Sequence, residues 1–177
     1  QDLAKHKRVR WTVPMSLGDS HHGFRVLGTT AAYFKHYRYA RKFPLKLAAG
    51  RPFEATKEVV LGAAVARELG YKLGQSVVIA HGAGEINIVE HDEYPMSVVG
   101  ILARTGTPVD RTIHVSLESI TLIHDDPATP LSSRDRFLSL IRPPDKDRDL
   151  TPKSITAFLV GTRTKIDIFR LQRDVNR

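Results

Sequence analysis

Histidine and carboxylate side chains are the groups in this sequence that could support chemistry, because the chain has eight His and no Cys. Three clusters combine imidazole with a second imidazole or with acids: His21-His22, His91-Asp92-Glu93 and His124-Asp125-Asp126. Such groups suit zinc or a similar ion. None has the i, i+4 spacing that fixes two ligands on one helix, so a site would have to assemble through tertiary structure. The alternative is that each cluster is a solvated loop. The candidate metal ligands are His21, His22, His91 and His124.

Motifs of the common catalytic sites are missing. The sequence contains no Gly-x-Ser-x-Gly, no His-Glu-x-x-His and no Walker-type phosphate loop. Gly62 lies between a predicted strand and a predicted helix, as a glycine does in phosphate-binding turns. A single glycine is also ordinary backbone packing in such a turn. The lack of cysteine excludes disulfides, thiolate metal sites and a cysteine nucleophile. We predict that the chain is not an enzyme and holds no cofactor.

A basic and aromatic stretch covers residues 35–43, KHYRYARKF, in a chain whose formal net charge is +8. This composition is typical of nucleic-acid-binding surfaces. A second interpretation is that Tyr37, Tyr39 and Phe43 pack inward while the cations lie in solvent. A third places the cations near anionic lipid headgroups. No signature of an RNA- or DNA-binding fold accompanies the stretch, so we do not expect nucleic acid as a partner.

Residues 125–154 hold five of the ten prolines and much of the charge. This composition predicts an irregular excursion with one short helix at 132–141. Phe137, Leu138 and Ile141 make that helix a candidate contact for a partner protein. The alternative is a disordered insertion.

One strand-helix-strand unit organises the predicted fold. Glu58–Leu61 is predicted as a short buried strand, followed by an amphipathic helix in which Val65 and Leu69 share a face. Gly70 stands where a helix C-cap favours a left-handed residue. A second strand is predicted at residues 75–80.

Further strands are predicted where apolar residues alternate or cluster between turn residues. They cover residues 9–13, ended by Pro14; 24–27, after a turn at 18–23; 95–102, with Gly100 as a bulge or close backbone approach; 111–115; and 155–161, a buried strand. Residues 47–53 are predicted as a turn-rich segment.

The remaining helices are predicted from their caps and apolar faces. Residues 3–10 resemble the end of a basic helix, and a helix at 31–37 would be capped by Thr29 or Thr30. Ser116 caps a helix that ends near His124 and buries Leu117, Ile120 and Ile123. Thr164–Asp167 resembles a capping box that opens a terminal helix, in which a face is shared by Ile168, Leu171 and Val175. Because strands and helices do not alternate regularly, we predict the α+β class.

No segment of this sequence is predicted to span a membrane. The longest apolar run, Val59–Ala66, has about eight residues, whereas a spanning helix needs about 20. The first residues lack the apolar region of a signal peptide. The sequence begins without an initiator Met, so we expect a fragment or a processed chain.

Five strings follow one another in a characteristic order. They are GTTAAYF at 28–34, LAAGRPF at 47–53, EVVLG and VARELG within 58–70, MSVVGIL at 96–102, and RTIHVSLESI at 111–120, followed by a closing strand and helix at 155–177. Together they resemble the extracytoplasmic core of MacB/FtsX-like ABC transporter permeases, over about residues 11–175.

The resemblance implies one domain over residues 1–177, inserted between the first two transmembrane helices of a permease. Its two-lobed core would have a βαβ-rich lobe near the membrane and a smaller β-containing lobe. We place residues 1–45 with 96–177 in one lobe and residues 46–95 in the other. Such domains do no chemistry and relay the motion of an ATPase across the membrane.

The implied partners are a second permease subunit, a cytoplasmic ATP-binding subunit and a periplasmic partner protein. Flanking helices outside this chain would enter the membrane, so the parent protein would lie in a bacterial inner membrane with this segment in the periplasm. The alternative is a stand-alone basic module that binds a metal ion or nucleic acid.

Overall fold

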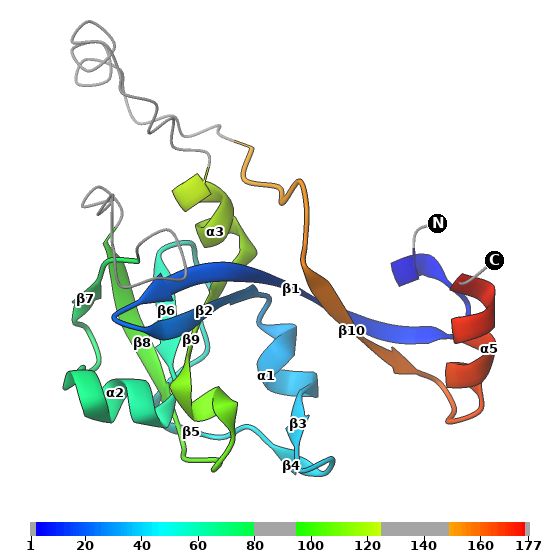
Figure 1. The fold of residues 1–177 in the computed structure, drawn as a ribbon, viewed down its shortest axis with the longest axis horizontal. Coiled ribbons are helices and arrows are strands. Elements are labelled where there is room, and N and C mark those ends of the chain that lie inside the picture. The colour runs from blue at the N-terminus through cyan, green and yellow to red at the C-terminus, as the bar shows by residue number, and fades with distance from the viewer. Residues whose placement is uncertain (1–2, 80–94, 125–148, 176–177) are drawn as a thin grey trace, which may run out of the picture.

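The computed structural model describes residues 3–79, 95–124 and 149–175 (Figure 1). Its strands are β1 (Val9–His21), β2 (Phe24–Thr29), β3 (Arg38–Tyr39), β4 (Phe43–Pro44), β5 (Leu47–Gly50), β6 (Glu58–Leu61), β7 (Ser76–Val77), β8 (Met96–Leu102), β9 (Thr112–Ser116) and β10 (Ala157–Thr162). Its helices are η1 (Leu3–Lys5), α1 (Ala32–His36), α2 (Ala63–Leu69), η2 (Pro108–Arg111), α3 (Leu117–His124) and α5 (Asp167–Val175).

One mixed sheet connects most of these strands. They pair in the order β10-β1-β2-β9-β6-β8-β5, with β7 beside β8, while β3 and β4 form a separate hairpin. Pairing is parallel between β2 and β9 and between β6 and β8, and the other pairs are antiparallel. This mixed sheet with short helices confirms the predicted α+β class. Strands from residues 47–77 join strands from 96–116, and the division into two lobes stays a prediction.

The central unit begins with β6, in which Val59, Val60 and Leu61 have no exposed surface. Gly62 then turns the chain into α2, and Gly70 ends α2 in the predicted left-handed conformation with φ 72°. The predicted second strand at residues 75–80 was only partly right. The strand observed there, β7, is two residues long and pairs with β8, so it does not pair with β6 as a second strand of the unit.

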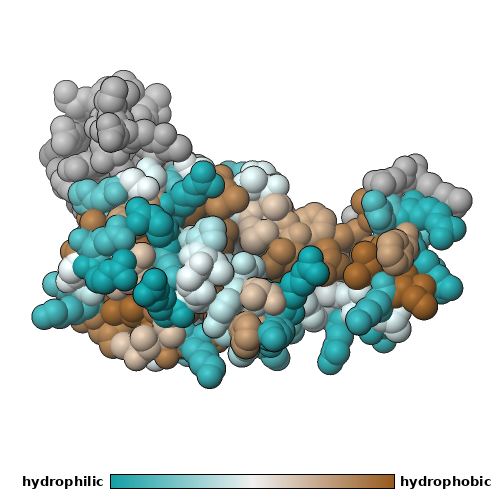
Figure 2. All heavy atoms as spheres, turned by 60° about the horizontal axis from the view of Figure 1, so that its bottom comes forward, coloured by the Kyte–Doolittle hydropathy of each residue, from teal (hydrophilic) through white to brown (hydrophobic). Residues whose placement is uncertain are grey.

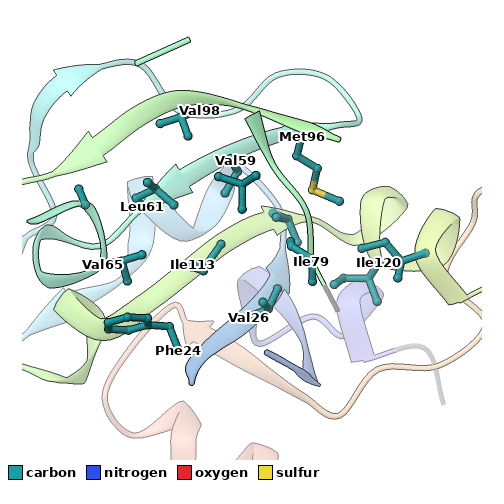
Figure 3. Close-up of a cluster of buried hydrophobic side chains, with 14 residues drawn as sticks. Phe24, Val26, Val59, Leu61, Val65, Ile79, Met96, Val98, Ile113 and Ile120 are labelled. Atoms are coloured by element: carbon teal, nitrogen blue, oxygen red, sulfur yellow. The ribbon is translucent and has the colours of Figure 1, made fainter. Parts of the chain in front are cut away.

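The largest core lies between the sheet and the helices α2 and α3. Figure 3 shows Val65 and Ile120 from these helices directed at strand residues such as Val59, Leu61 and Ile113. Val60 points the other way, into a second cluster. Because side chains alternate along a strand, β6 supplies both cores at once.

Two predicted helix caps are confirmed. Ser116 Oγ accepts a hydrogen bond from Ser119 N at 3.1 Å, and α3 buries Leu117, Ile120 and Ile123. Thr164 N donates to Asp167 Oδ2 at 3.1 Å while Asp167 N donates to Thr164 Oγ1 at 3.3 Å, which is the reciprocal arrangement of a capping box.

The prediction that Pro14 ends the first strand is wrong. The strand, β1, continues through Pro14 to His21. Met15 is the last residue of β1 that pairs with β10, and Ser16 is the first that pairs with β2. A proline lacks the backbone donor of a continuous ladder, and it is tolerated here because the strand is changing partners. The predicted turn at 18–23 is reduced to His22 and Gly23.

Four further expectations need correction. Residues 47–53 include a strand, β5, that pairs with β8. Helix α1 has no side-chain cap, because Thr29 Oγ1 donates instead to the Pro14 carbonyl at 2.8 Å. The helical end predicted at residues 3–10 is confined to the short η1. The last predicted strand is not buried: Phe158 of β10 is 45% exposed, because β10 has a strand neighbour on one side within the described sheet.

The molecule is extended along β1, whose first half forms a two-stranded ribbon with β10 that leads away from the main sheet (Figure 1). Helices η1 and α5 lie together at the far end of this ribbon. Within the described residues, no helix has the length and apolar character needed to cross a bilayer.

We expect Gly100→Ala to destabilise the fold. The β6–β8 register shifts beside Gly100, and a Cβ there would lie 2.2 Å from the Arg51 carbonyl oxygen, so the backbone would have to move. The expected loss in free energy of unfolding is about 1–3 kcal/mol, measured by chemical denaturation. Ser97→Ala at an exposed position of β8 is the matched control. Equal stability of the two variants would contradict the close approach.

We expect Glu58→Gln to weaken the acid dependence of stability. The hydrogen bonds from Arg51, followed by backbone N–H groups of Glu54 and Ala55, lower the pKa of Glu58 from 4.5 to about 2. A lowered folded-state pKa stabilises the fold above the unfolded value, and this stabilisation is lost as pH falls from 4.5 toward 2. Its size is about 1–2 kcal/mol, because the partly exposed Arg51 is screened by solvent. Denaturation at several pH values tests this, with the exposed Glu118→Gln as control; identical pH profiles for wild type and Glu58→Gln would refute it.

Candidate functional site

The histidine pair at the end of β1 is held by aromatic contacts. The rings of His21 and His22 meet edge-on with centroids 4.3 Å apart, and His21 Nε2 lies 2.9 Å from the Tyr71 hydroxyl. Burial, and then the neighbouring His22, lower the pKa of His21. Among the described residues, no three His, Asp or Glu side chains converge as metal ligands do.

The other candidate metal ligands are His91 and His124. His91 lies outside the described residues, and so does the side chain of His124, whose backbone ends α3. Phe137, Leu138 and Ile141, the candidate partner contacts, also lie outside them. These assignments stay predictions.

The basic and aromatic stretch at 35–43 forms the end of α1 and the β3–β4 hairpin. The expectation that its aromatic rings pack inward is right for Tyr37, which stacks on Tyr33 with centroids 4.8 Å apart. It is wrong for Phe43, which is 45% exposed and lies under the Lys42 ammonium at 4.9 Å. The hairpin is too short to bury this side chain, so a cationic and aromatic tip faces solvent.

The burial of His114 is not predictable from the pattern of residues around it. This residue of β9 has no exposed surface, and its ring lies 5.3 Å from Tyr33 and 5.7 Å from Phe34 between centroids. Its Nδ1 lies 3.3 Å from the Val60 carbonyl oxygen, and Nε2 has no hydrogen-bond partner in the described part of the chain. Burial lowers the pKa of His114 to about 4. The imidazole is therefore a neutral core group that ties β9 to β6.

A group of charged side chains from both ends of the described chain meets near η1, β1 and α5. His6 Nε2 and Arg8 Nη1 lie 3.4 and 3.8 Å from Asp174 Oδ2 on α5, and Arg8 Nε lies 3.9 Å from Asp167 Oδ1. Arg8, Arg170, Arg173 and Asp174 together line a surface pocket. The sequence shows these residues only as scattered cations and acids, since Arg8 is more than 150 positions from α5. This terminal arginine pocket (Arg8, Arg170, Arg173 and Asp174) is the candidate interaction site.

We expect stability to fall between pH 6.5 and about 4 because of His114. Its folded pKa lies below 6.5, the usual value for histidine, so the unfolded chain binds a proton that the folded chain excludes. The expected loss by pH 4 is about 3 kcal/mol. The variant His114→Leu removes the titrating group, and denaturation should then show a flatter profile in this range. An unchanged profile for His114→Leu would count against a neutral buried imidazole.

The chain as a whole is similar to one protein family and to solved structures of transporter domains. The family profile of the MacB-like periplasmic core domain matches residues 2–167. The extracellular domain of the noncanonical ABC-type transporter YknZ from Gram-positive bacteria is 14% identical, with 96% of this chain and 73% of that chain covered and a TM-score of 0.55. The periplasmic region of MacB from Actinobacillus actinomycetemcomitans is 15% identical, with 99% and 80% covered and a TM-score of 0.48.

The comparison with curated proteins finds no match. At 14% identity, the likeness to YknZ shows a shared fold. The family match covers more than nine tenths of the sequence and agrees with the predicted resemblance. The chain belongs to the MacB-like periplasmic core domain family, the extracytoplasmic domains of ABC transporter permeases.

Proposed function

We propose that this domain transmits ATP-driven movement of a permease to a substrate or partner protein outside the membrane, without catalysing a reaction. One observation carries the proposal: β1 is a continuous strand of 13 residues that connects the β1–β10 ribbon to the main sheet. At about 3.3 Å per residue it spans about 40 Å. Val9–Met15 pair with β10 near the terminal arginine pocket, and Ser16–His21 pair with β2 in the main sheet.

A displacement of the chain at the terminal arginine pocket would therefore reach the main core through the hydrogen-bonded backbone of β1. The ion pairs of Arg8 with Asp167 and Asp174 join the start of β1 to α5, so segments attached on either side would move this end as one unit. The well-packed main core resists deformation and would pass the displacement on.

The assembly we propose has a second permease subunit and a cytoplasmic ATP-binding subunit. Helices flanking this chain would enter a bacterial inner membrane, with this segment in the periplasm. A periplasmic partner protein would bind the domain, and Phe137, Leu138 and Ile141 stay candidates for that contact. The family match favours this interpretation over a stand-alone module that binds metal or nucleic acid.

The test is to insert two glycines between Met15 and Ser16 in the parent permease assembled with its ATPase. An even insertion keeps the alternation of side chains but loosens the strand where it changes partners. We expect basal ATP hydrolysis to stay within about twofold of wild type while ATP-driven transport falls at least about tenfold, a cost of about 1.4 kcal/mol in coupling.

The control is the same insertion after Lys153, in an exposed irregular segment. Circular dichroism and thermal unfolding of each variant check the fold. If the β1 insertion unfolds the domain, the double substitution Met15→Gly/Ser16→Gly replaces it. Wild-type transport by a folded β1 variant would rule out transmission along this strand.

A further inference from the structure

One end of the molecule carries a high density of positive charge. Residues 3–10 and 163–175 contain eight Lys and Arg side chains and two Asp, a formal charge of +6 out of the total +8. The two segments lie side by side at the end of the β1–β10 ribbon, joined by the contacts of Asp174 with His6 and Arg8 (Figure 1). An anionic partner would be attracted to this end of the molecule.

The terminal arginine pocket has the chemistry of a phosphate site. Arg170 and Arg173 are three positions apart on α5 and so project from neighbouring positions of the helix surface, while Arg8 comes from the start of β1. Asp174 is the one acid in the lining and offsets one of three guanidinium charges. Arg8 Nε is buried and makes no hydrogen bond within the described structure. Guanidinium groups bind phosphate oxygens through paired N–H donors.

Apolar side chains project beside this pocket into solvent. Phe169 is 70% exposed and Ile166 is 64% exposed, the highest values among the large hydrophobic side chains of the described residues. Leu171 packs against the protein, and two residues along a helix correspond to about 200°, so Phe169 lies on the outward side. Figure 2 shows hydrophobic and hydrophilic residues side by side at this end of the molecule.

An anionic bilayer surface can bind both parts of this end, the cations and the exposed apolar side chains. Headgroup phosphates satisfy arginines, and the region just below them accepts an aromatic or aliphatic side chain. A nucleic acid could stack a base on Phe169 but would leave the aliphatic Ile166 in water, and a free anion would leave both side chains there. Charge complementarity and apolar exposure together therefore favour a lipid surface.

We propose that the α5 end of this domain binds anionic phospholipids. The phosphate of a headgroup occupies the terminal arginine pocket, and Phe169 and Ile166 enter the interface beside it. The inference rests on the proposed function, because a permease domain lies next to a bilayer. The inference adds to that function that the side chains of this domain bind the bilayer surface directly.

The test is flotation of the purified chain with vesicles of phosphatidylcholine alone or mixed with phosphatidylglycerol. We expect binding to the anionic vesicles only, and a loss of that binding at about 1 M salt, where the screening length is about 3 Å. Removing both α5 cations in Arg170→Gln/Arg173→Gln should weaken binding about twentyfold or more, since each cation near the surface contributes about fivefold. Phe169→Ser should weaken it about tenfold.

The matched control is Lys72→Gln/Arg104→Gln, which removes the same charge at exposed positions outside the α5 end and should bind as wild type does. All four substituted cations are exposed, so each variant should keep the wild-type unfolding midpoint. Equal weakening by the two charge variants would overturn the proposal, because attraction by net charge would then suffice. Two other results would also overturn it: no flotation, or calorimetric saturation with inorganic phosphate without vesicle binding.

These outcomes are independent of the transport test. Loss of vesicle binding leaves the coupling through β1 intact, and loss of coupling in the β1 insertion variant leaves α5 unchanged. The two proposals therefore fail separately.

Discussion

The burial of Val59, Val60 and Leu61 in β6 is the constraint on which the rest of the structure depends. Val59 and Leu61 fill the main core on one face, and Val60 fills the second cluster on the other. The two edges of β6 pair with β8 and β9, one parallel and one antiparallel. A parallel neighbour requires a crossover connection, which the segment containing α2 begins. The backbone must also come close at Gly62 and Gly100, where a Cβ would meet carbonyl oxygens, so elements on all sides of β6 are placed within narrow limits.

Local features of this fold were predictable because neighbouring residues determine them. The strand and helix on either side of Gly62, the left-handed Gly70 and the Ser116 cap follow from patterns of a few residues. Strand partners do not. Nothing near Pro14 shows that β1 changes from one neighbour to another there, and nothing near Ser76 shows that β7 pairs with β8. Pairing depends on chain segments that are distant in sequence, so it could not be derived from short patterns.

The candidate site was less predictable than the fold. Its residues come from both ends of the sequence, and lone arginines among many cations carry no motif. His21 and His22 were noticed for their metal-ligand chemistry, yet the contact that fixes His21 is the Tyr71 hydroxyl, 50 positions away. His114 sits in an ordinary β-strand pattern, and its burial depends on Tyr33 and Phe34 from α1. Chemistry-bearing residues were visible in the sequence, but their surroundings were not.

As an edge strand of the described sheet, β10 influences whether copies of the protein associate in solution. Along its outer side, backbone donors and acceptors have no strand partner within the described residues, and such an edge can serve as a template for a strand of another molecule. The cations that follow β10, Arg163 and Lys165, act as gatekeepers because two copies approaching edge to edge would bring like charges together. Added salt screens this repulsion. Crowding and high ionic strength should thus promote self-association through β10. At low ionic strength, repulsion between these cations should keep the copies apart.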